Sequence, residues 1–457
     1  MKRSKNSLSR RDFLHSTATL AAAAGFAGAF VRSAGAEPGR RRGQSSVFGL
    51  RFPPMDKVRA GIIGVGGRGS SLVHTLLDID KVEIRALCDL VPERVKRHQR
   101  IIAEHGQTEP AGYTRGETDF ENLCRRDDLD IVYIDTPWEW HVPMALCAMK
   151  NGRHAAIEVP AATTLDECWE LVKTAEQTRR HCIMLENCCY GETEMLFLNM
   201  TRLGLLGDLT HAEAGYLHDL RAVLYDQQSE GNWRRRYHAR FNGNLYPTHG
   251  LGPVAQYLGI NGGDKFDHLV SLSSLERSLS KRRDSLPGGD PRRLENFVCG
   301  DMNTTLIKTA LGRSIKVQHC VTTPRPYSRV NLVSGTGGIL CDYPPRVFLE
   351  GQQSENWDDN IQKYHEKYGH PLWKRVRNMA VKSGGHGGMD FVLNWRLVQC
   401  LREGQALDMT VYDAAAWSSV FPLSVASVAK GSAPVDCPDF TRGEWKHQPP
   451  LAIVGSV

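Results

Sequence analysis

The sequence predicts an α/β protein in which a doubly wound parallel sheet is followed by an α+β domain with an open, mainly antiparallel sheet. Three observations lead to this prediction. Short apolar runs alternate with helix-length segments, a glycine-rich turn follows the first run, and the alternation stops near residue 188. With 457 residues, 41% hydrophobic and 24% charged, the chain is long enough for about two or three domains.

The first 36 residues have the features of an export leader. Arg10 and Arg11 precede Asp-Phe-Leu, an Ala- and Gly-rich run follows, and Ala34-Gly35-Ala36 offers a small-residue cleavage site. The pattern resembles a twin-arginine leader, with His15 where a lysine is common. A general secretory leader or a disordered basic tail are the alternatives. The twin-arginine interpretation predicts export in the folded state, to a periplasmic or extracellular location.

Charge and cysteine usage exclude several classes of partner. The first 36 residues hold six basic residues and one acidic residue, so most of the net charge of +6 lies there and the remainder is nearly neutral. We therefore expect neither nucleic acid nor a charged membrane surface as partner, and no later apolar run predicts a membrane span. The 12 cysteines follow the leader and include no Cys-x-x-Cys, which favours buried thiols; no ligand spacing predicts a metal site.

The first domain is expected after an unstructured stretch. Residues 37–56 lack periodicity and predict a linker or an arm on the surface. We therefore place the first domain, a Rossmann domain expected to bind a dinucleotide, at residues 57–187. Its alternating elements predict the parallel sheet. The expected strands are Val58–Ile63, Val82–Asp89, Ile131–Thr136, Ala155–Glu158 and Cys182–Glu186; the expected helices are Gly67–Leu77, one from Pro92, His141–Lys150 and Leu165–Thr178.

Residues 188–457 form the predicted second domain. An apolar helix is expected at Thr410–Ala429, and Ser271–Arg293, rich in Arg, Ser, Pro and Gly, is expected to be an exposed loop. Strands are expected at Leu209–Leu217, Thr304–Thr309, Ser314–Val321 and Val330–Ser334.

A dinucleotide site is the first functional prediction. Gly64-x-Gly66-x-x-Gly69 follows the first strand and opens a helix, and Asp89 stands at the end of the next strand. Glycines permit close approach of a pyrophosphate, and the carboxylate can accept from ribose hydroxyls, which favours NAD over NADP in a Rossmann domain. The alternatives are a glycine turn without a ligand, and Asp89 as a helix N-cap.

Later strand ends predict the rest of the crevice. Thr136-Pro137-Trp138-Glu139-Trp140-His141, Glu158-Val159-Pro160 and Asn187 each follow a predicted parallel strand. Ligands of open α/β sheets bind at these carboxyl ends. The two tryptophans have core packing as their alternative.

These residues carry a resemblance to known families. Gly-x-Gly-x-x-Gly, Cys-Asp, Thr-Pro-x-x-x-His and Glu-x-Pro resemble the Gfo/Idh/MocA oxidoreductases, whose usual Glu-Lys-Pro supplies a catalytic lysine. Here Val159 replaces that lysine, and valine cannot titrate. Together with Trp-Glu-Trp-His, Asn187-Cys-Cys-Tyr-Gly and the segment 244–253, Asn-Leu-Tyr-Pro-Thr-His-Gly-Leu-Gly-Pro, this departure resembles glycoside hydrolase family 109, whose known activity is that of an NAD-dependent α-N-acetylgalactosaminidase.

The resemblance implies a set of contacts in this chain. To the motif glycines Gly64, Gly66 and Gly69 it adds cofactor contacts from Gly67, Arg68, Asp89, Trp138, Glu139, Trp140, His141, Glu158, Val159 and Asn187. The implied sugar contacts are Tyr216, Arg234, Tyr246, Pro247, Thr248, His249 and Tyr327.

The resemblance also implies a mechanism without net oxidation. NAD oxidises the sugar C3 hydroxyl, a base removes the C2 proton, the C1 substituent is expelled, water adds, and the hydride returns to C3 with retention of configuration. Proton transfer is expected from His249, Tyr246 and Tyr190, with Glu158 nearby. A tyrosine base needs a cationic neighbour, which Arg234 or NAD could provide.

Alternatives remain at the level of residues and of function. Taken alone, His249 would be a structural histidine, the tyrosines packing residues, and Arg234-Arg235-Arg236 a solvated basic face; the role of His386 is open. The functional alternatives are a net sugar dehydrogenase and a non-catalytic sugar- or NAD-binding protein. The substrate expected is a glycan carrying α-N-acetylgalactosamine, and analogy with the family suggests a homo-oligomer.

Overall fold

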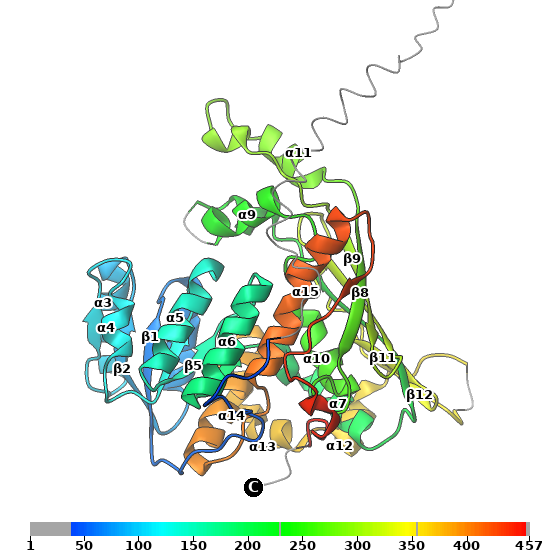
Figure 1. Cartoon of the computed structure of the whole chain (residues 1–457), viewed down its shortest axis with the longest axis horizontal. Coiled ribbons are helices and arrows are strands. Elements are labelled where there is room, and N and C mark those ends of the chain that lie inside the picture. The colour runs from blue at the N-terminus through cyan, green and yellow to red at the C-terminus, as the bar shows by residue number, and fades with distance from the viewer. Residues whose placement is uncertain (1–37, 228–229, 353–354, 454–457) are drawn as a thin grey trace, which may run out of the picture.

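Two sheets organise the protein, as the computed structural model of the chain shows (Figure 1). The structure describes residues 38–227, 230–352 and 355–453, and the predicted leader lies outside them. Within the described residues, no helix is long and apolar enough to cross a membrane.

The N-terminal sheet is parallel and has six strands in the order β3-β2-β1-β4-β5-β6, which is that of a dinucleotide-binding fold. One helical layer consists of α4, α5 and α6, and α2 packs beside α3 on another. The strands are β1 (Val58–Ile63), β2 (Val82–Cys88), β3 (Ala111–Tyr113), β4 (Ile131–Ile134), β5 (His154–Ile157) and β6 (Cys182–Met184); the helices are α2 (Gly67–Leu77), α3 (Pro92–Glu104), α4 (Phe120–Cys124), α5 (Trp138–Lys150) and α6 (Leu165–Thr178).

The second sheet has eight strands in the order β13-β12-β11-β7-β10-β9-β8-β14. All pairings are antiparallel except that of β7 with β10. The predicted fold class, a parallel sheet followed by a mainly antiparallel one, is therefore confirmed. The strands are β7 (Leu209–Leu217), β8 (Phe266–Ser273), β9 (Asn303–Thr309), β10 (Ser314–Cys320), β11 (Leu332–Gly335), β12 (Gly338–Cys341), β13 (Arg346–Leu349) and β14 (Val435–Asp436).

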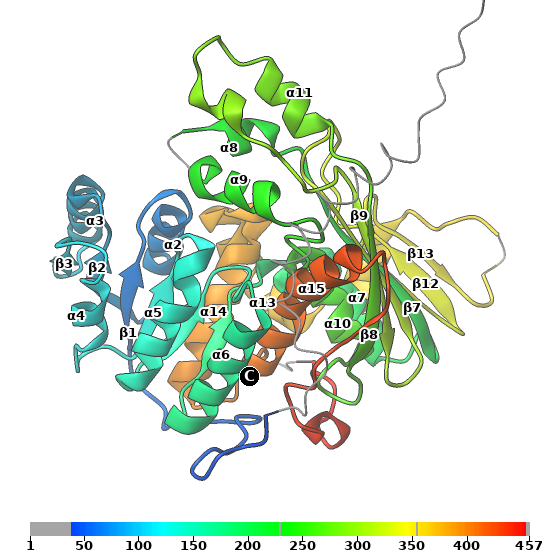
Figure 2. The same cartoon turned by 45° about the horizontal axis from the view of Figure 1, so that its top comes forward.

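Two C-terminal helices return to the first domain. In Figure 1, α15 runs between the two sheets, and it packs on both α6 and β8, while α14 packs on α2 (Figure 2). Thr410 and Asp413 form a capping box at the start of α15, which explains its N-terminus. The remaining helices are α7 (Glu192–Arg202), α8 (Arg221–Tyr225), α9 (Gly231–Arg240), α10 (Thr248–Leu258), α11 (Ser278–Asp284), α12 (Ile361–Tyr368), α13 (Pro371–Ser383), α14 (Met389–Glu403) and α15 (Val411–Ala429), and short 3₁₀ turns cover Asn187–Tyr190, Pro291–Leu294, His386–Gly388 and Glu444–Lys446.

The segment from residue 38 to 56 is an arm held against this framework. Arg40 donates to the buried carboxylate of Glu176 at 2.9 Å, and Glu176 also accepts from Arg442 at 2.7 Å and from Tyr412 at 2.9 Å. The backbone N–H of Val47 donates to the Tyr412 hydroxyl. The arm is therefore part of the folded unit.

Two sequence expectations require correction. Ser271–Arg293 is not a loop throughout, because it contains the end of β8, helix α11 and part of a 3₁₀ turn; Leu279 is fully buried there and its carbonyl accepts from the Tyr225 hydroxyl at 2.8 Å. The two tryptophans lie on the first turn of α5, which begins at Trp138 rather than at His141. All 12 cysteines are free and 11 are buried, as expected for structural thiols.

Candidate active site

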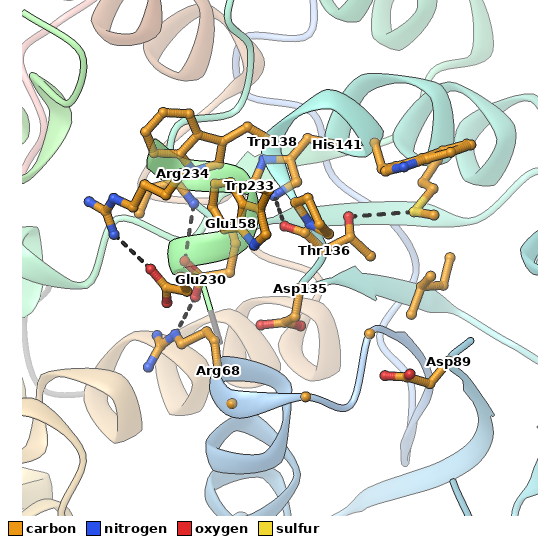
Figure 3. A pocket seen from close by; sticks show the side chains of 18 of the residues that line it. Arg68, Asp89, Asp135, Thr136, Trp138, His141, Glu158, Glu230, Trp233 and Arg234 are labelled. Carbon is orange, nitrogen blue, oxygen red and sulfur yellow. Dashed lines mark hydrogen bonds and ion pairs between the residues drawn. The ribbon is translucent and has the colours of Figure 1, made fainter. Parts of the chain in front are cut away.

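A cleft of about 850 Å³ lies between the carboxyl ends of the parallel strands and the second domain. Figure 3 shows its floor, where Arg68 and the glycine loop face the ends of β4 and β5, and Arg234 and Trp233 approach from above. The strand-end residues that the sequence predicted are thus gathered in one cavity. The predicted site residues that line it are Gly64, Gly66, Gly67, Arg68, Asp89, Trp138, Trp140, His141, Glu158, Val159, Asn187, Tyr216, Arg234, Tyr246 and His249.

The glycine loop is shaped for a ligand. A Cβ at Gly69 would lie 1.9 Å from the Gly64 carbonyl oxygen, so the turn itself requires a glycine there. A Cβ at Gly67 would meet nothing within 4 Å, which leaves the loop open toward the cleft. Helix α2 begins there without a side-chain cap, and its N-terminal N–H groups suit an anionic pyrophosphate.

Asp89 closes the nucleotide end of the cleft. Its carboxylate accepts from the N–H groups of Val65 and Val91, both at 2.9 Å, so it is fixed beside the glycine loop. Val91, not Asp89, is the N-cap residue of α3, and the N-cap alternative is therefore wrong. The chemistry of this end fits a dinucleotide with free ribose hydroxyls.

Two strand-end turns are joined by His141. Its ring nitrogens lie 2.8 Å from the carbonyl oxygens of Pro160 and Thr136, respectively. Both carbonyls belong to residues that follow parallel strands, so the imidazole fixes the spacing of the turns. Val159 lines the same cavity, and the structure thus places an apolar side chain where the oxidoreductases that this sequence resembles carry lysine.

An aromatic cluster connects the two domains above the cleft. Trp138 packs against Trp233, with ring centroids 5.3 Å apart, and stacks with Tyr246 at 5.8 Å. The guanidinium of Arg234 lies 5.4 Å from the centre of the Trp138 ring and 4.7 Å from that of Tyr246. Arg234 and Arg235 are buried, so the solvated-face alternative is wrong for both, whereas Arg236 is exposed.

Glu186, His249 and Tyr246 form a chain of polar contacts. His249 Nδ1 lies 2.7 Å from a carboxylate oxygen of Glu186, and His249 Nε2 lies 3.4 Å from the Tyr246 hydroxyl. Burial alone would raise the pKa of Glu186, but the charge of His249 and hydrogen bonding outweigh it and lower this pKa. The ionised carboxylate holds a proton on Nδ1, so that Nε2 is the atom able to accept one.

Tyr246 is held in its neutral form. Burial raises its pKa well above the usual value, although the neighbouring charge of Arg234 acts in the opposite direction. The cationic neighbour expected for a tyrosine base is thus present, but burial dominates. In this arrangement the Tyr246 hydroxyl is a proton donor beside the acceptor nitrogen of His249.

Several predicted residues lie elsewhere. Tyr190 requires a correction: its 3₁₀ turn directs the side chain toward Asp408, whose carboxylate accepts from the hydroxyl at 3.2 Å, and Tyr190 lines a separate small cavity. Its role in proton transfer is not supported by this geometry. Residues that stand next to the cleft without lining it are Gly69, Glu139, Pro247, Thr248 and Tyr327.

Three carboxyl groups of the site were not assigned from the sequence. Glu186 orients His249; Asp390 bonds Arg68, Asn187 and His386; and Asp135 lies under the glycine loop. Burial, then the nearby Glu158, raises the pKa of Asp135 well above its usual value. Glu186 and Asp135 directly follow strand-end hydrophobic runs, which is the signal that could have found them.

The ligand atoms of Glu186, Cys188 and His249 lie within 4.8 Å of one another, a grouping that could hold a metal ion. Their spacing in the sequence did not suggest it. However, burial raises the pKa of the Cys188 thiol well above its usual value, whereas the thiolate is the metal-binding form. The direct contact of Glu186 with His249 accounts for the grouping as a hydrogen-bonded pair.

Comparison with known proteins gives the family. Residues 190–447 match the family described as "Glycosyl hydrolase 109, C-terminal domain", and residues 58–186 match "Oxidoreductase family, NAD-binding Rossmann fold". The chain belongs to glycosyl hydrolase family 109. It is therefore an NAD-binding member of a glycoside hydrolase family, as the resemblance in the sequence indicated.

Full-length relatives carry the same family name. A glycosyl hydrolase family 109 protein of Solibacter usitatus (strain Ellin6076) is 51% identical over 446 residues, which is 97% of this chain and 99% of the relative. Glycosyl hydrolase family 109 protein 2 of Shewanella sp. (strain ANA-3) is 50% identical over 454 residues, 98% of this chain and 99% of the relative.

Solved structures share the fold of this family 109 chain at low identity. A levoglucosan dehydrogenase in complex with NADH superimposes with a TM-score of 0.63 at 18% identity, covering 84% of this chain and 100% of that one. An NAD-binding oxidoreductase from Klebsiella pneumoniae gives 0.65 at 16% identity with the same coverage. The open glycine loop, uncapped helix and Asp89 fit the cofactor NAD.

Proposed function

We propose that this chain hydrolyses terminal α-linked N-acetylgalactosamine by reversible oxidation at C3, with retention at the anomeric carbon. The observation that carries the proposal is the chain of Glu186, His249 and Tyr246 beside a dinucleotide cleft that has valine in place of a titratable lysine. Family membership supports the hydrolytic outcome. A pair of carboxylates flanking the glycosidic bond is not required, since NAD-dependent glycosidases use another route.

The chemistry that bound NAD supplies is a reversible hydride acceptor at C3 of the sugar. The residues proposed to hold it are those of the cleft floor. They are Gly66, Gly67, Arg68, Asp89, Trp138, Trp140, His141, Glu158, Val159 and Asn187.

Proton transfer is assigned to His249 and Tyr246. His249 Nε2 takes the proton of the C3 hydroxyl as C3 is oxidised, and the resulting ketone acidifies the hydrogen at C2. His249 Nε2, once it has passed the first proton to water in the cleft, removes the C2 proton, and the resulting enolate forms the C1–C2 double bond as the C1–O bond breaks. The Tyr246 hydroxyl, held neutral by burial, donates to the developing oxyanion. Water then adds its hydroxyl to C1 and a proton to C2, and C3 is reduced again.

Arg234 is proposed as a sugar contact. Its Nη1 donates to Glu230 at 2.7 Å, while Nη2 is buried without a hydrogen-bond partner among the described residues. An unpaired guanidinium donor is costly to bury unless a ligand satisfies it. A sugar oxygen beside Tyr216 and Tyr246 would do so.

His386 is proposed to protonate the leaving oxygen. It lines the cleft, its side chain is 59% exposed, and Nδ1 lies 2.8 Å from Asp390, which leaves Nε2 to exchange a proton. With Tyr190 directed elsewhere, His386 is an ionisable group that can reach bulk water from the cleft. The proton it gives to the glycosidic oxygen is restored from water.

The test is hydrolysis of an aryl α-N-acetylgalactosaminide by purified protein in deuterated water. We expect phenol release, deuterium at C2 of the free sugar, retained configuration and no accumulation of NADH. Stoichiometric NADH would instead identify a net dehydrogenase. If the protein binds NAD but hydrolyses none of a panel of glycosides, it would instead be a non-catalytic binding protein.

We also propose export by the twin-arginine route, on the basis of Arg10 and Arg11 and the cleavage site that follows. Because that route carries folded proteins, the buried thiols and a cofactor acquired in the cytoplasm are compatible with it. Fractionation of cells that express the chain should give mature protein outside the cytoplasm. An Arg10→Lys, Arg11→Lys variant that is exported equally well would contradict the route.

A further inference from the structure

Asp390 connects three segments whose side chains line the cleft, although Asp390 itself does not line it. Its carboxylate accepts from Arg68 Nη1 at 2.7 Å and Nη2 at 3.0 Å, and from Asn187 Nδ2 at 2.7 Å. It also contacts His386 Nδ1 at 2.8 Å. Arg68 belongs to the glycine loop, Asn187 follows β6, and His386 lies in the loop before α14. One buried carboxylate therefore holds the cofactor side and the leaving-group side together.

The loop around His386 is built to approach this carboxylate. Gly385 has φ of +64°, and a Cβ there would lie 2.9 Å from Asp390 Oδ2. A larger residue would push the loop off the carboxylate. His386 itself has φ of +47°, a conformation that a non-glycine residue adopts at some cost. The contact with Asp390 helps to maintain it.

The carboxylate is charged when it makes these contacts. Burial alone would raise the pKa of Asp390, but hydrogen bonding to His386 and the charge of Arg68 outweigh it and hold the pKa below its usual range. Arg68 is held from its other side by Glu158, through Nε. Charge-assisted hydrogen bonds of this kind are about twice as strong as neutral ones.

We propose that Asp390 is a positioning residue that couples the cofactor cradle to the acid of the reaction. Through His386 it sets the imidazole that protonates the leaving oxygen, and through Arg68 and Asn187 it sets side chains that meet NAD. The part of this inference that concerns protonation of the leaving group rests on the proposed function. The part that concerns NAD binding can be measured without turnover.

The test compares Asp390→Asn with the wild type in two measurements. Across aryl α-N-acetylgalactosaminides whose phenols span a range of pKa, we expect a rate loss of about 100-fold for the poorest leaving groups, which need an acid, and little loss for the best. His386→Ala should steepen the same dependence, and the double variant should be no slower than His386→Ala. NAD titrated against the fluorescence of the cleft tryptophans should show about tenfold weaker binding.

Asp408→Asn is a matched control. Asp408 is a partly buried aspartate whose side chain is 8% exposed, bonded to both Nε and Nη2 of Arg396, in a cluster with Tyr190 outside the cleft. We expect this variant to melt at a lower temperature while its leaving-group dependence and NAD affinity stay those of the wild type. Asp390→Glu keeps the charge and displaces it by one methylene; if Asp390→Asn does not fold, Asp390→Glu should show both changes to a smaller extent.

The outcomes separate the inference from the proposed function. Equal rate loss for all leaving groups, or wild-type NAD affinity in the Asp390 variants, overturns the coupling while leaving the glycosidase intact. If the wild type releases no phenol from any glycoside, the proposed function fails, and an unchanged NAD affinity would then overturn the inference as well. A change in one measurement alone also overturns it, since the proposal requires both.

Discussion

Single contacts decide what the residues of the cleft can do. His249 and Glu186 are 63 positions apart in the sequence, yet their side chains lie 2.7 Å apart. A histidine without this partner could carry its proton on either ring nitrogen, whereas the carboxylate selects Nδ1 and leaves Nε2 as the acceptor. The pairing turns a common residue type into a candidate base.

Glu186→Gln should therefore reduce activity without unfolding the chain. The amide oxygen can still accept from Nδ1, but the charge that stabilises the imidazolium is lost, so we expect kcat to fall by about 100-fold. Aryl glycoside kinetics measure this. Glu176→Gln, at a buried carboxylate far along α6, should lower the melting temperature and leave kcat unchanged. Equal kcat losses in the two variants would contradict the assignment.

Two aspartates of the same cleft should respond differently to loss of charge. Asp89 is expected to bind ribose hydroxyls as a carboxylate, so Asp89→Ala should weaken NAD binding by about 10- to 100-fold. Burial raises the pKa of Asp135 and so favours its uncharged form; Asp135→Asn puts an uncharged polar group of similar size there, so NAD affinity should stay within about twofold. Fluorescence titration with NAD tests both, and a large loss in Asp135→Asn would show that its charge is needed.

At the scale of elements, α15 fastens the two domains to each other. Three of its buried serines accept backbone N–H groups: Ser418 from Ala161, Ser424 from Asn244 and Ser427 from Ser271. Ala161 follows Glu158-Val159-Pro160 in the first domain, whereas the other two N–H groups belong to the second. The helix therefore satisfies backbone groups on both sides of the cleft, and its polar residues are structural.

Ser418→Ala should destabilise the fold more than Ser419→Ala. Loss of the Ser418 hydroxyl leaves the buried N–H of Ala161 unpaired, which costs about 1 to 3 kcal/mol. Ser419 is equally buried, but its hydroxyl donates to the carbonyl oxygen of Ala416 in its own helix. Its removal therefore leaves no N–H group without a partner. Denaturant unfolding measures both variants; equal losses would contradict this account.

At the scale of the whole molecule, buried histidines link stability to pH. Burial lowers the pKa of His181 and His370 to about 4 and that of His238 to about 3. His370 Nδ1 accepts from the N–H of Leu372 at the start of α13, and His154 Nδ1 accepts from that of His181. A nitrogen that accepts cannot carry a proton, so these contacts require neutral rings.

The melting temperature should consequently fall as the pH drops from about 6.5 toward 4. Unfolded histidines titrate near 6.5, so in this range the unfolded chain binds protons that the folded chain does not, and each such histidine costs up to about 1.4 kcal/mol per pH unit. Thermal melts from pH 7.5 to 4.5 measure the loss. His370→Asn keeps an N-cap acceptor that does not titrate, and its decline should be shallower. Parallel curves for the two proteins would contradict the role of His370.

The sequence by itself determined the fold class, five of the six parallel strands and the cofactor end of the site; it missed the short edge strand β3. Gly64, Gly69 and Asp89 act through the local backbone, in a turn and at the end of a strand, so their spacing along the chain carries the information. The carboxyl ends of parallel strands must meet at one edge, which is why Trp138 and Glu158 could be placed in the same crevice.

Only the tertiary structure decided how the second half completes the site. The orientation of Tyr190 toward Asp408, the pairing of Glu186 with His249, and the convergence of Arg68, Asn187 and His386 on Asp390 join segments that no periodicity relates. The pKa values of Asp135 and Tyr246 also depend on the tertiary structure, because burial and neighbouring charges shift them. Those quantities depend on packing between distant elements, and a linear pattern does not record them.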